Sequence, residues 1–281
     1  MREVTVEAIA RKVKELFLAA NTRIGADILE ALEGALGREK SPLGRSVLSM
    51  ILENNRLAAQ EGMAVCQDTG LAVVFVKLGQ EVLIRGGGYQ EAINRGVEEA
   101  YREGCLRLSV VDDPLFERRN TLTNTPAVVY TDLVPGDRIL IRVTAKGFGS
   151  ENMSALGMLK PADGPQGVID FIVTAVKNAG PNPCPPTVVG VGIGGTADRA
   201  MVMAKEATLR RLGRPHPDER YARLEAEALK RINALGIGPA GLGGSTTALA
   251  VHIETMPTHI AGLPVAVNLC CHAARHAEGS L

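Results

Sequence analysis

One stretch of the sequence decides the fold: Thr187-Val188-Val189-Gly190-Val191-Gly192-Ile193, which runs into Gly194-Gly195. Its branched apolar residues and glycines carry no charge, which predicts a strand buried on both faces. A segment with a helical pattern follows, from about Arg199 to Leu212. A buried strand that turns directly into a helix is typical of α/β proteins, in which the two kinds of element alternate along the chain.

The first 62 residues are expected to be mainly helical. Apolar residues recur every three or four positions from Val6 to Ala20, which predicts an amphipathic helix. A second helical pattern starts near Ile24 and is expected to end at the glycines Gly34 and Gly37. A third helix is expected to begin at Pro42 and to close at Gly62.

Strands and helices alternate through the rest of the chain, so we expect the α/β class with small sheets and the site on loops at strand ends. No internal repeat or flexible linker is visible, and a single domain over residues 1–281 is expected. Strands are predicted at 64–66, 72–78, 127–130, 138–143, 187–193, 247–253 and 264–269, and helices after 88 and at 167–179, 199–212 and 217–235.

Charge and hydropathy exclude two broad classes of function. Lys+Arg and Asp+Glu both number 31, so the formal net charge is zero. General binding to nucleic acid or to a membrane surface needs a basic excess. There is also no run of about 18 apolar residues, so no membrane span is expected. The charged residues near the N-terminus, such as Glu3, Glu7 and Lys12, do not fit a signal peptide.

Five cysteines are present: Cys66, Cys105, Cys184, Cys270 and Cys271. An odd number without regular spacing is a poor disulfide framework. Adjacent cysteines would pair with each other only under strain. The sequence therefore favours a reducing, cytoplasmic setting.

Three of these cysteines lie in short polar stretches: Cys66-Gln67-Asp68-Thr69-Gly70, Asn182-Pro183-Cys184-Pro185-Pro186 and Asn268-Leu269-Cys270-Cys271-His272. Each stretch is expected at a strand end or in a loop. We interpret them as converging on one iron–sulfur cluster. A cluster held by three cysteines leaves one iron open to act as a Lewis acid. There is no Cys-x-x-Cys pair, and the spacing alone leaves ordinary buried cysteines as an alternative.

A second motif supports a different function. Gly190-Val191-Gly192-Ile193-Gly194-Gly195 fits the G-x-G-x-x-G pattern of dinucleotide-binding enzymes, between a strand and a helix. The expected next strand with an acidic end is missing, and two charged helices follow instead. We expect these glycines to let the chain pass close to the cluster and to aim a helix N-terminus at an anion. A non-catalytic iron–sulfur subunit is a further alternative.

Four separated motifs, taken together, resemble the class I fumarase and L-tartrate dehydratase family, in its α subunit or N-terminal half. The resemblance covers essentially the whole chain. It implies a [4Fe-4S] cluster with three cysteine ligands and the reversible addition of water across the double bond of a dicarboxylate. The motifs are Cys66-Gln67-Asp68-Thr69-Gly70, Gly147-x-Gly149-Ser150-x-Asn152, Cys184-Pro185-Pro186 with Gly194-Gly195-Thr196, and Cys271-His272-x-x-Arg275.

The resemblance assigns the cluster ligands to Cys66, Cys184 and Cys271. Cys270 competes for the third place, but the family pattern puts histidine directly after the ligand, as His272 follows Cys271. Neighbours on a strand point to opposite faces, so one of the pair should reach the cluster. Cys105 has no motif around it, and a packing role is expected.

The resemblance also implies roles for polar residues near the cluster. Asp68 would act on the hydroxyl that leaves or arrives, with support from His259, and Gln67 would lie near the open iron. The family's carboxylate-binding arginine matches Arg107, whose planar fork can donate two parallel hydrogen bonds. Gly149 matches a position where the backbone approaches substrate. The alternatives are a surface-turn aspartate, a buried structural histidine, a surface arginine and a plain turn glycine.

From these residues we expect the α subunit of a fumarate hydratase that forms malate, with L-tartrate dehydratase as the alternative. Asp68, His259 and Arg107 together argue against a non-catalytic subunit. Proton abstraction needs a base on the far side of the substrate, and no further motif supplies one. We therefore expect a β subunit that carries the base and additional cationic contacts, in a hetero-oligomer with two copies of each chain. The chain alone should be inactive and should expose apolar area near the cluster.

Overall fold

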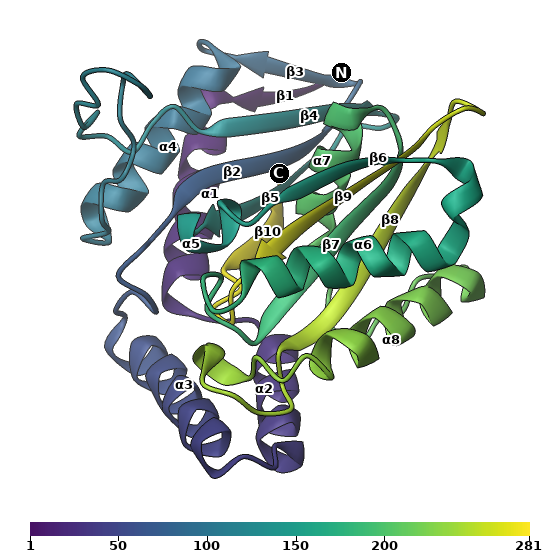
Figure 1. The fold of residues 1–281 in the computed structure, drawn as a ribbon. Helices are drawn as coiled ribbons and strands as arrows, with labels where there is room; N and C mark the ends of the chain where they lie inside the picture. The colour runs from purple at the N-terminus through teal and green to yellow at the C-terminus, as the bar shows by residue number, and fades with distance from the viewer. The chain divides into compact units, whose positions relative to one another are not determined.

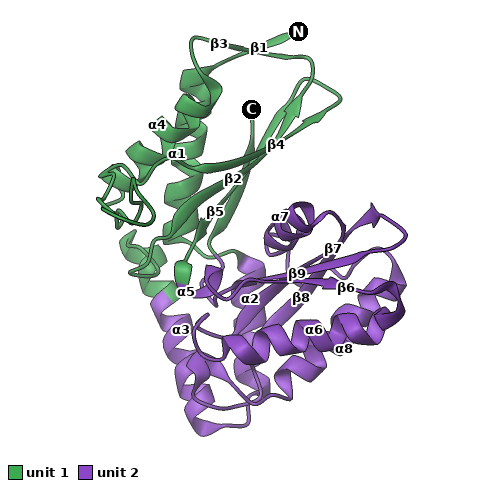
Figure 2. Cartoon of the chain, turned by 45° about the horizontal axis from the view of Figure 1, so that its top comes forward, with its two compact units in different colours: residues 1–25, 55–148, 275–281 green, residues 26–54, 149–274 purple.

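The computed structural model describes residues 1–281 without a gap and divides into two compact units, coloured separately in Figure 2. Unit 1 comprises Met1–Gly25, Asn55–Phe148 and Arg275–Leu281. Unit 2 comprises Ala26–Asn54 and Gly149–Ala274. The chain therefore leaves unit 1 and returns to it twice, so each unit is assembled from segments far apart in the sequence.

Unit 1 is built on a four-stranded sheet in the order β10-β5-β2-β4 (Figure 1). Strand β2 (Leu71–Gly79) pairs antiparallel with β5 (Ile139–Lys146) and parallel with β4 (Val128–Val134). A separate parallel pair joins β1 (Arg2–Thr5) to β3 (Val82–Arg85). The buried core of this unit joins the central strands to two helices.

Those two helices, α1 (Val6–Thr22) and α4 (Tyr89–Glu103), pack closely together. The Thr5 side chain caps α1 by accepting a hydrogen bond from the Ala8 backbone N at 3.2 Å. A Cβ on Gly96 would lie 2.4 Å from the Ala10 carbonyl oxygen, so glycine sets how closely the helices approach.

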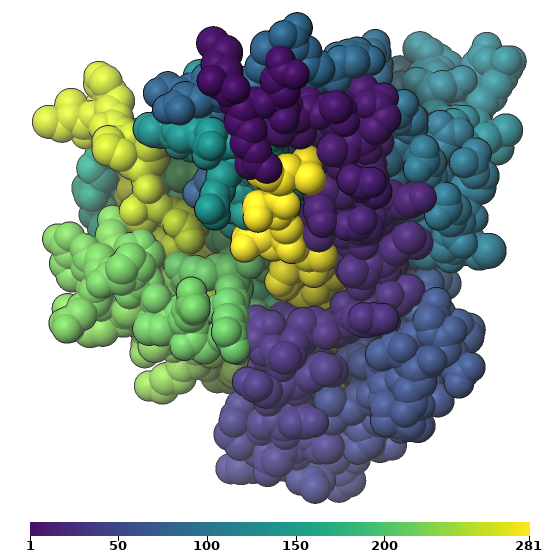
Figure 3. All heavy atoms as spheres, turned by 180° about the vertical axis from the view of Figure 1, so that it is seen from behind, coloured from purple at the N-terminus to yellow at the C-terminus, as the bar shows by residue number.

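The last strand, β10 (His276–Ser280), was not predicted from the sequence. It pairs antiparallel with β5 at the edge of the sheet. In Figure 3 the yellow C-terminal residues lie directly against the dark purple α1, and a Cβ on Gly279 would be 3.3 Å from Leu16. The C-terminal segment is therefore part of the body of unit 1 and carries Arg275 into it.

Unit 2 has a second four-stranded sheet in the order β6-β9-β7-β8. Its central strand is the decisive stretch, β7 (Thr187–Gly195), which pairs parallel with β8 (Ala248–Thr258) and antiparallel with β9 (Leu263–Cys270). The edge strand β6 (Ala155–Leu159) pairs with β9. The buried core joins β7, β8 and β9 to α6 (Gly164–Ala179) and α8 (Glu219–Asn233).

The other face of this sheet carries α7 (Ala197–Ala207), whose Ala200 and Ala204 are buried. A Cβ on Gly190 would lie 2.0 Å from the Ala204 carbonyl oxygen, and one on Gly192 would lie 2.1 Å from that of Ala200. These glycines therefore allow α7 to lie directly on the strand. Helix–sheet packing therefore accounts for Gly190 and Gly192 without a dinucleotide, and the expected approach of the chain to a cluster stays a prediction.

The prediction of an α/β chain with small sheets is confirmed. Three helices fill most of the N-terminal part: α1, α2 (Ala26–Arg38) and α3 (Pro42–Glu61). Helix α2 continues through Gly34 and Gly37, because its buried stripe extends to Ala35. No strand forms at 64–66, where the Val65 backbone N bonds to the Asn21 carbonyl instead. The short elements are α5 (Phe148–Glu151), η1 (Pro161–Asp163) and η2 (Pro239–Gly241).

Every helix in the chain is too short or too polar to span a bilayer.

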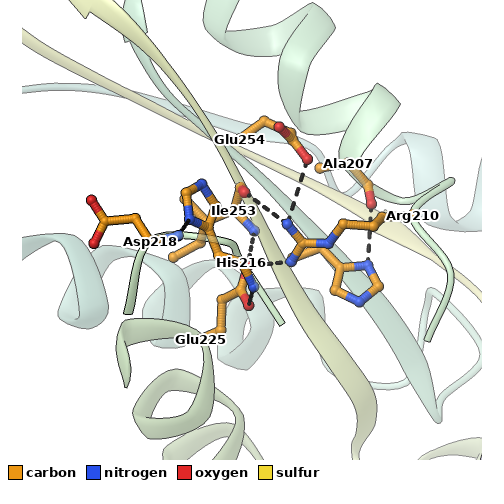
Figure 4. Close-up of polar contacts among 8 residues, drawn as sticks. Ala207, Arg210, His216, Asp218, Glu225, Ile253 and Glu254 are labelled. Atoms are coloured by element: carbon orange, nitrogen blue, oxygen red, sulfur yellow. Dashed lines mark hydrogen bonds and ion pairs between the residues drawn. The ribbon is translucent and has the colours of Figure 1, made fainter. Parts of the chain in front are cut away.

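A buried polar network anchors α8 to β8 in unit 2 (Figure 4). The Arg210 guanidinium donates to the Glu225 carboxylate and, at 3.1 Å, to the Ile253 carbonyl. Glu225 also accepts from the backbone N of Ile253 at 2.7 Å and of His216 at 3.0 Å. These bonds compensate the burial of the Glu225 carboxylate, and Arg210 also lies 3.5 Å from the Glu254 carboxylate.

His252 lies beside this network with 3% of its surface exposed, and its Nδ1 is 3.2 Å from the Ala207 carbonyl oxygen. Burial, together with the nearby Arg210 cation, lowers the pKa of His252 to about 4, although the carboxylates of Glu225 and Asp27 act the other way. An unfolded histidine has a pKa of about 6.5. The unfolded chain therefore takes up this proton before the folded one does.

We predict that the native state loses stability as the pH falls from about 6.5 towards 4. Between pH 7.5 and pH 5 this group alone should lower the free energy of unfolding by about 2 kcal/mol. Urea unfolding of the wild type and of His252→Gln at the two pH values measures the effect. The variant should lack this component, and an equal pH dependence in both proteins would contradict the assignment.

Candidate active site

The Cys66–Gly70 loop joins α3 to β2 in unit 1, as expected from its position between a helical and an apolar segment. It ends at Gly70, whose φ is +78°. A Cβ there would lie 2.7 Å from the Ala145 backbone and 2.8 Å from that of Lys146. Both the positive φ and this close approach require glycine. The loop is thereby pressed against the end of β5.

Both oxygens of the Asp68 carboxylate are oriented by backbone amides. Oδ1 accepts from the Gly70 N at 3.0 Å, and Oδ2 accepts from the Phe148 N at 3.0 Å. A Cβ on Gly147 would come within 3.3 Å of Asp68 Oδ2 and 3.2 Å of an Arg275 Nη2. The glycine-rich stretch after β5 therefore makes room for this carboxylate and fixes its direction.

Arg275 holds the same loop from inside unit 1. Its side chain is 2% exposed, and Nη1 donates to the Asp68 carbonyl oxygen and lies 3.5 Å from Asn21 Oδ1. Charged hydrogen bonds of this kind are stronger than neutral ones. The sequence showed Arg275 as part of a motif but gave it no role, because nothing in the pattern reveals that the guanidinium points inward.

Two further buried side chains secure the loop. The Tyr101 hydroxyl lies 2.7 Å from the Thr69 carbonyl and 2.9 Å from that of Gly70, and burial raises the pKa of Tyr101 well above its usual value. Asn124 donates to the Gly70 carbonyl at 3.2 Å and accepts from the Ser109 N at 2.7 Å. Asn124 thus connects the Asp68 loop to the segment that carries Arg107. Sequence patterns gave no signal for either residue.

A pocket of about 500 Å³ opens beside these residues, within unit 1. Asp68, Arg107 and Arg118 are its charged lining residues, and Ser109 adds a hydroxyl. Arg107 is exposed rather than packed, and its backbone carbonyl accepts from Thr69 Oγ1 at 3.1 Å. The predicted acid and the predicted carboxylate-binding arginine therefore line one cavity. Gln67 is exposed next to Asp68 in the same loop.

Cys184 and Cys271 lie together in unit 2, where the His272 backbone N donates to the Cys184 carbonyl at 3.3 Å. Cys184 is exposed just before β7, and its φ of +52° is unusual for a residue with a Cβ. Cys271 is half-buried just after β9, whereas Cys270 is 8% exposed and belongs to the core. The difference in burial agrees with the choice of Cys271 over Cys270. Cys105 is exposed, so its predicted packing role was wrong.

Gly149 belongs to unit 2 and lies close to the Cys184 loop. A Cβ on Gly149 would be 3.0 Å from the Asn182 carbonyl oxygen. Its neighbour Glu151 pairs with Lys205 at 2.5 Å and accepts from Asn268 Nδ2 at 2.9 Å. These contacts tie α5 to α7 and β9, so the Gly149 backbone has a defined position beside the loop.

His259 lies at the opposite end of the unit 2 sheet from Cys184 and Cys271. It follows β8, whose end at Thr258 is in register with Gly195 at the end of β7, whereas Cys184 precedes the start of β7. The nine residues of β7 span about 30 Å. His259 is exposed, with Nδ1 accepting from the Ala261 N at 3.2 Å, so the alternative of a buried structural histidine is wrong.

The predicted site residues are thus divided between the units. Unit 1 contains Cys66, Gln67, Asp68 and Arg107, and unit 2 contains Gly149, Cys184, His259 and Cys271. Neither unit by itself gathers three cysteine, histidine or carboxylate side chains into a group that could hold a metal ion.

The family model described as fumarate hydratase (Fumerase) matches residues 10–280. The chain therefore belongs to the class I fumarase and L-tartrate dehydratase α-subunit family, whose members are hydro-lyases that use an iron–sulfur cluster.

Among relatives, a Methanocaldococcus jannaschii protein provisionally named L(+)-tartrate dehydratase subunit alpha is 43% identical over 276 residues, which cover 96% of each chain. The L(+)-tartrate dehydratase subunit alpha of Escherichia coli K12 is 31% identical over 282 residues, covering all of this chain and 92% of the relative. That of E. coli O157:H7 is 32% identical over 283 residues, with the same coverage.

The cysteines fit the cluster that the family uses. Thiolate sulfur is the usual ligand of iron–sulfur clusters. The three predicted ligands are half-buried or exposed at strand ends, so their sulfurs are not enclosed in a core, in contrast to Cys270. The pocket chemistry fits a small anion, because two guanidinium groups and one carboxylate line it.

Proposed function

We propose that this chain is the α subunit of an L(+)-tartrate dehydratase. The observation that carries the proposal is the near full-length match to relatives named L(+)-tartrate dehydratase subunit alpha. From the sequence we expected fumarate, with tartrate as the alternative, whereas these relatives favour tartrate. The pocket that contains Asp68 and Arg107 supports a small dicarboxylate as substrate.

We infer that Cys66, Cys184 and Cys271 hold a [4Fe-4S] cluster. An iron without a protein ligand supplies Lewis-acid chemistry to a substrate oxygen. Asp68 is the proton-transfer group for the departing hydroxyl, because its carboxylate is held at the pocket by two backbone amides. Arg107 binds a substrate carboxylate, and Gln67 and the Gly149 backbone complete the substrate contacts.

His259 can play its proposed catalytic role only in an assembly of several chains. Within unit 2 it lies a full strand length from Cys184 and Cys271. Supporting Asp68 at a cluster held by those cysteines requires His259 to reach the site of another chain. Its position on an exposed turn beyond β8 is compatible with that role.

The proposed partner is a β subunit that supplies the base and further cations. The relatives' names, which specify a subunit alpha, support this. The loop beside the pocket also exposes large apolar side chains: Leu115 is 70% exposed, Phe116 82% and Leu122 73%. Exposed apolar groups next to an incomplete pocket are typical of a surface that another chain covers.

We predict that Cys66→Ser, Cys184→Ser and Cys271→Ser each lose the cluster, whereas Cys270→Ser keeps it, because Cys270 is buried in β9. Iron and acid-labile sulfide are measured after anaerobic purification. Equal loss in Cys270→Ser, with the fold intact by circular dichroism, would overturn the ligand assignment.

We predict that the chain with its cluster reconstituted has no dehydratase activity alone and gains it when co-expressed with its β subunit. Anaerobic assays with L-tartrate, fumarate and malate should then give the highest kcat/KM for L-tartrate. Faster turnover of fumarate would reject the substrate assignment. Full activity without a second polypeptide would reject the proposal that a β subunit supplies the base.

A further inference from the structure

The pocket in unit 1 contains a second guanidinium that no motif identified. Arg118 lines the same cavity as Asp68 and Arg107. Most of the remaining lining is apolar: Leu71, Val110, Val111, Pro114 and Phe148. Both guanidinium groups belong to exposed residues, so they are free to meet the carboxylates of an incoming anion.

The segment that presents Arg118 is ordered by its own hydrogen bonds. This segment is the loop from Val110 to Thr121. Its base is closed by the Thr121 N, which donates to the Val110 carbonyl at 2.8 Å, and by the Asp112 N, which donates to the Arg119 carbonyl at 2.9 Å. Asp113 caps its tip by accepting from the backbone N of residues 115, 116 and 117 at 2.8–3.0 Å. Bonds from the Leu115 amide and its neighbours lower the pKa of Asp113.

Arg118 is an exposed residue whose guanidinium is held by the backbone of its own loop. Its φ of +49° is unusual for a residue with a side chain, and Nη1 donates to the Pro114 carbonyl at 2.5 Å. No carboxylate lies within ion-pair distance of it; Asp113 is near enough to attract its charge, but the Asp113 oxygens accept from backbone amides. The next residue, Arg119, pairs with Glu117 at 2.7 Å and does not line the pocket. Both arginines are exposed, but Arg118 lines the pocket, whereas Arg119 is paired with Glu117 outside it.

A dicarboxylate brings two negative charges into a pocket that already contains Asp68. Arg107 can hold one of its carboxylates. Building on the dicarboxylate function proposed above, we propose that Arg118 binds the second carboxylate and so makes the pocket selective for diacids over monoacids. A planar guanidinium suits this task, because it can donate two parallel bonds to one carboxylate.

The test uses the complete enzyme with its β subunit and cluster, purified anaerobically. Succinate and its monoamide, succinamate, serve as unreactive probes that differ by one carboxylate. Their inhibition constants are measured against whichever diacid the enzyme turns over best. In the wild type succinate should bind more tightly, and Arg118→Gln should reduce this preference about tenfold or more, as loss of a charged hydrogen bond does. Arg119→Gln should leave it unchanged.

Arg118→Gln should raise KM for the substrate with a smaller effect on kcat, because the carboxylate is bound before and during reaction. A preference for succinate within twofold of the wild type in Arg118→Gln, with cluster absorbance retained, would overturn the proposal. If that variant loses its cluster, Arg118→Lys is measured instead. An intact cluster with a reduced preference for succinate over succinamate supports the bidentate contact. An unchanged preference overturns the proposal. The identity of the best diacid tests the tartrate assignment separately.

Discussion

The buried guanidinium of Arg275 is the contact on which the geometry of unit 1 depends. It enters with the last segment of the chain, which adds β10 to the sheet and lies against α1. From there it bonds the carbonyl of Asp68, the residue proposed to transfer the proton. Tyr101 and Asn124 bind the neighbouring carbonyls from two other segments. Three distant parts of the sequence therefore converge on one five-residue loop, and the side chains that bind it are themselves buried.

The sequence could predict those parts of the fold whose pattern lies within one segment of the chain. The strand β7 was visible because its apolar residues are continuous, and its alternating glycines were visible as a pattern. The reason for the glycines was not, since it lies in the approach of α7 to the strand at Gly190 and Gly192. Short edge strands such as β6 and β10 carry little periodicity of their own, and their pairing partners are far away in the sequence.

The site was predictable where residues of unusual chemistry stand next to one another. Cys66 with Asp68, and Cys271 with His272, are recognisable from the sequence alone. Arg118 and Asn124 were not, because arginine and asparagine are common in loops and their roles depend on the direction of a side chain. For His259 the sequence match was informative but incomplete. The motif identified the residue, yet the sheet topology separates it from Cys184. A sequence match assigns a residue to a site without saying which chain's site it is.

We conclude that unit 1 fixes the Asp68 loop through Arg275. Hydrogen–deuterium exchange at the Gly70 and Phe148 amides of the isolated, cluster-free chain tests it most directly, because both amides donate to the Asp68 carboxylate. The account predicts slow exchange at both positions in the wild type. In Arg275→Met exchange there should be about tenfold faster or more, while amides of β7 in unit 2 keep their protection. Unprotected Gly70 and Phe148 amides in the wild type, or equal rates in the two proteins, would contradict it.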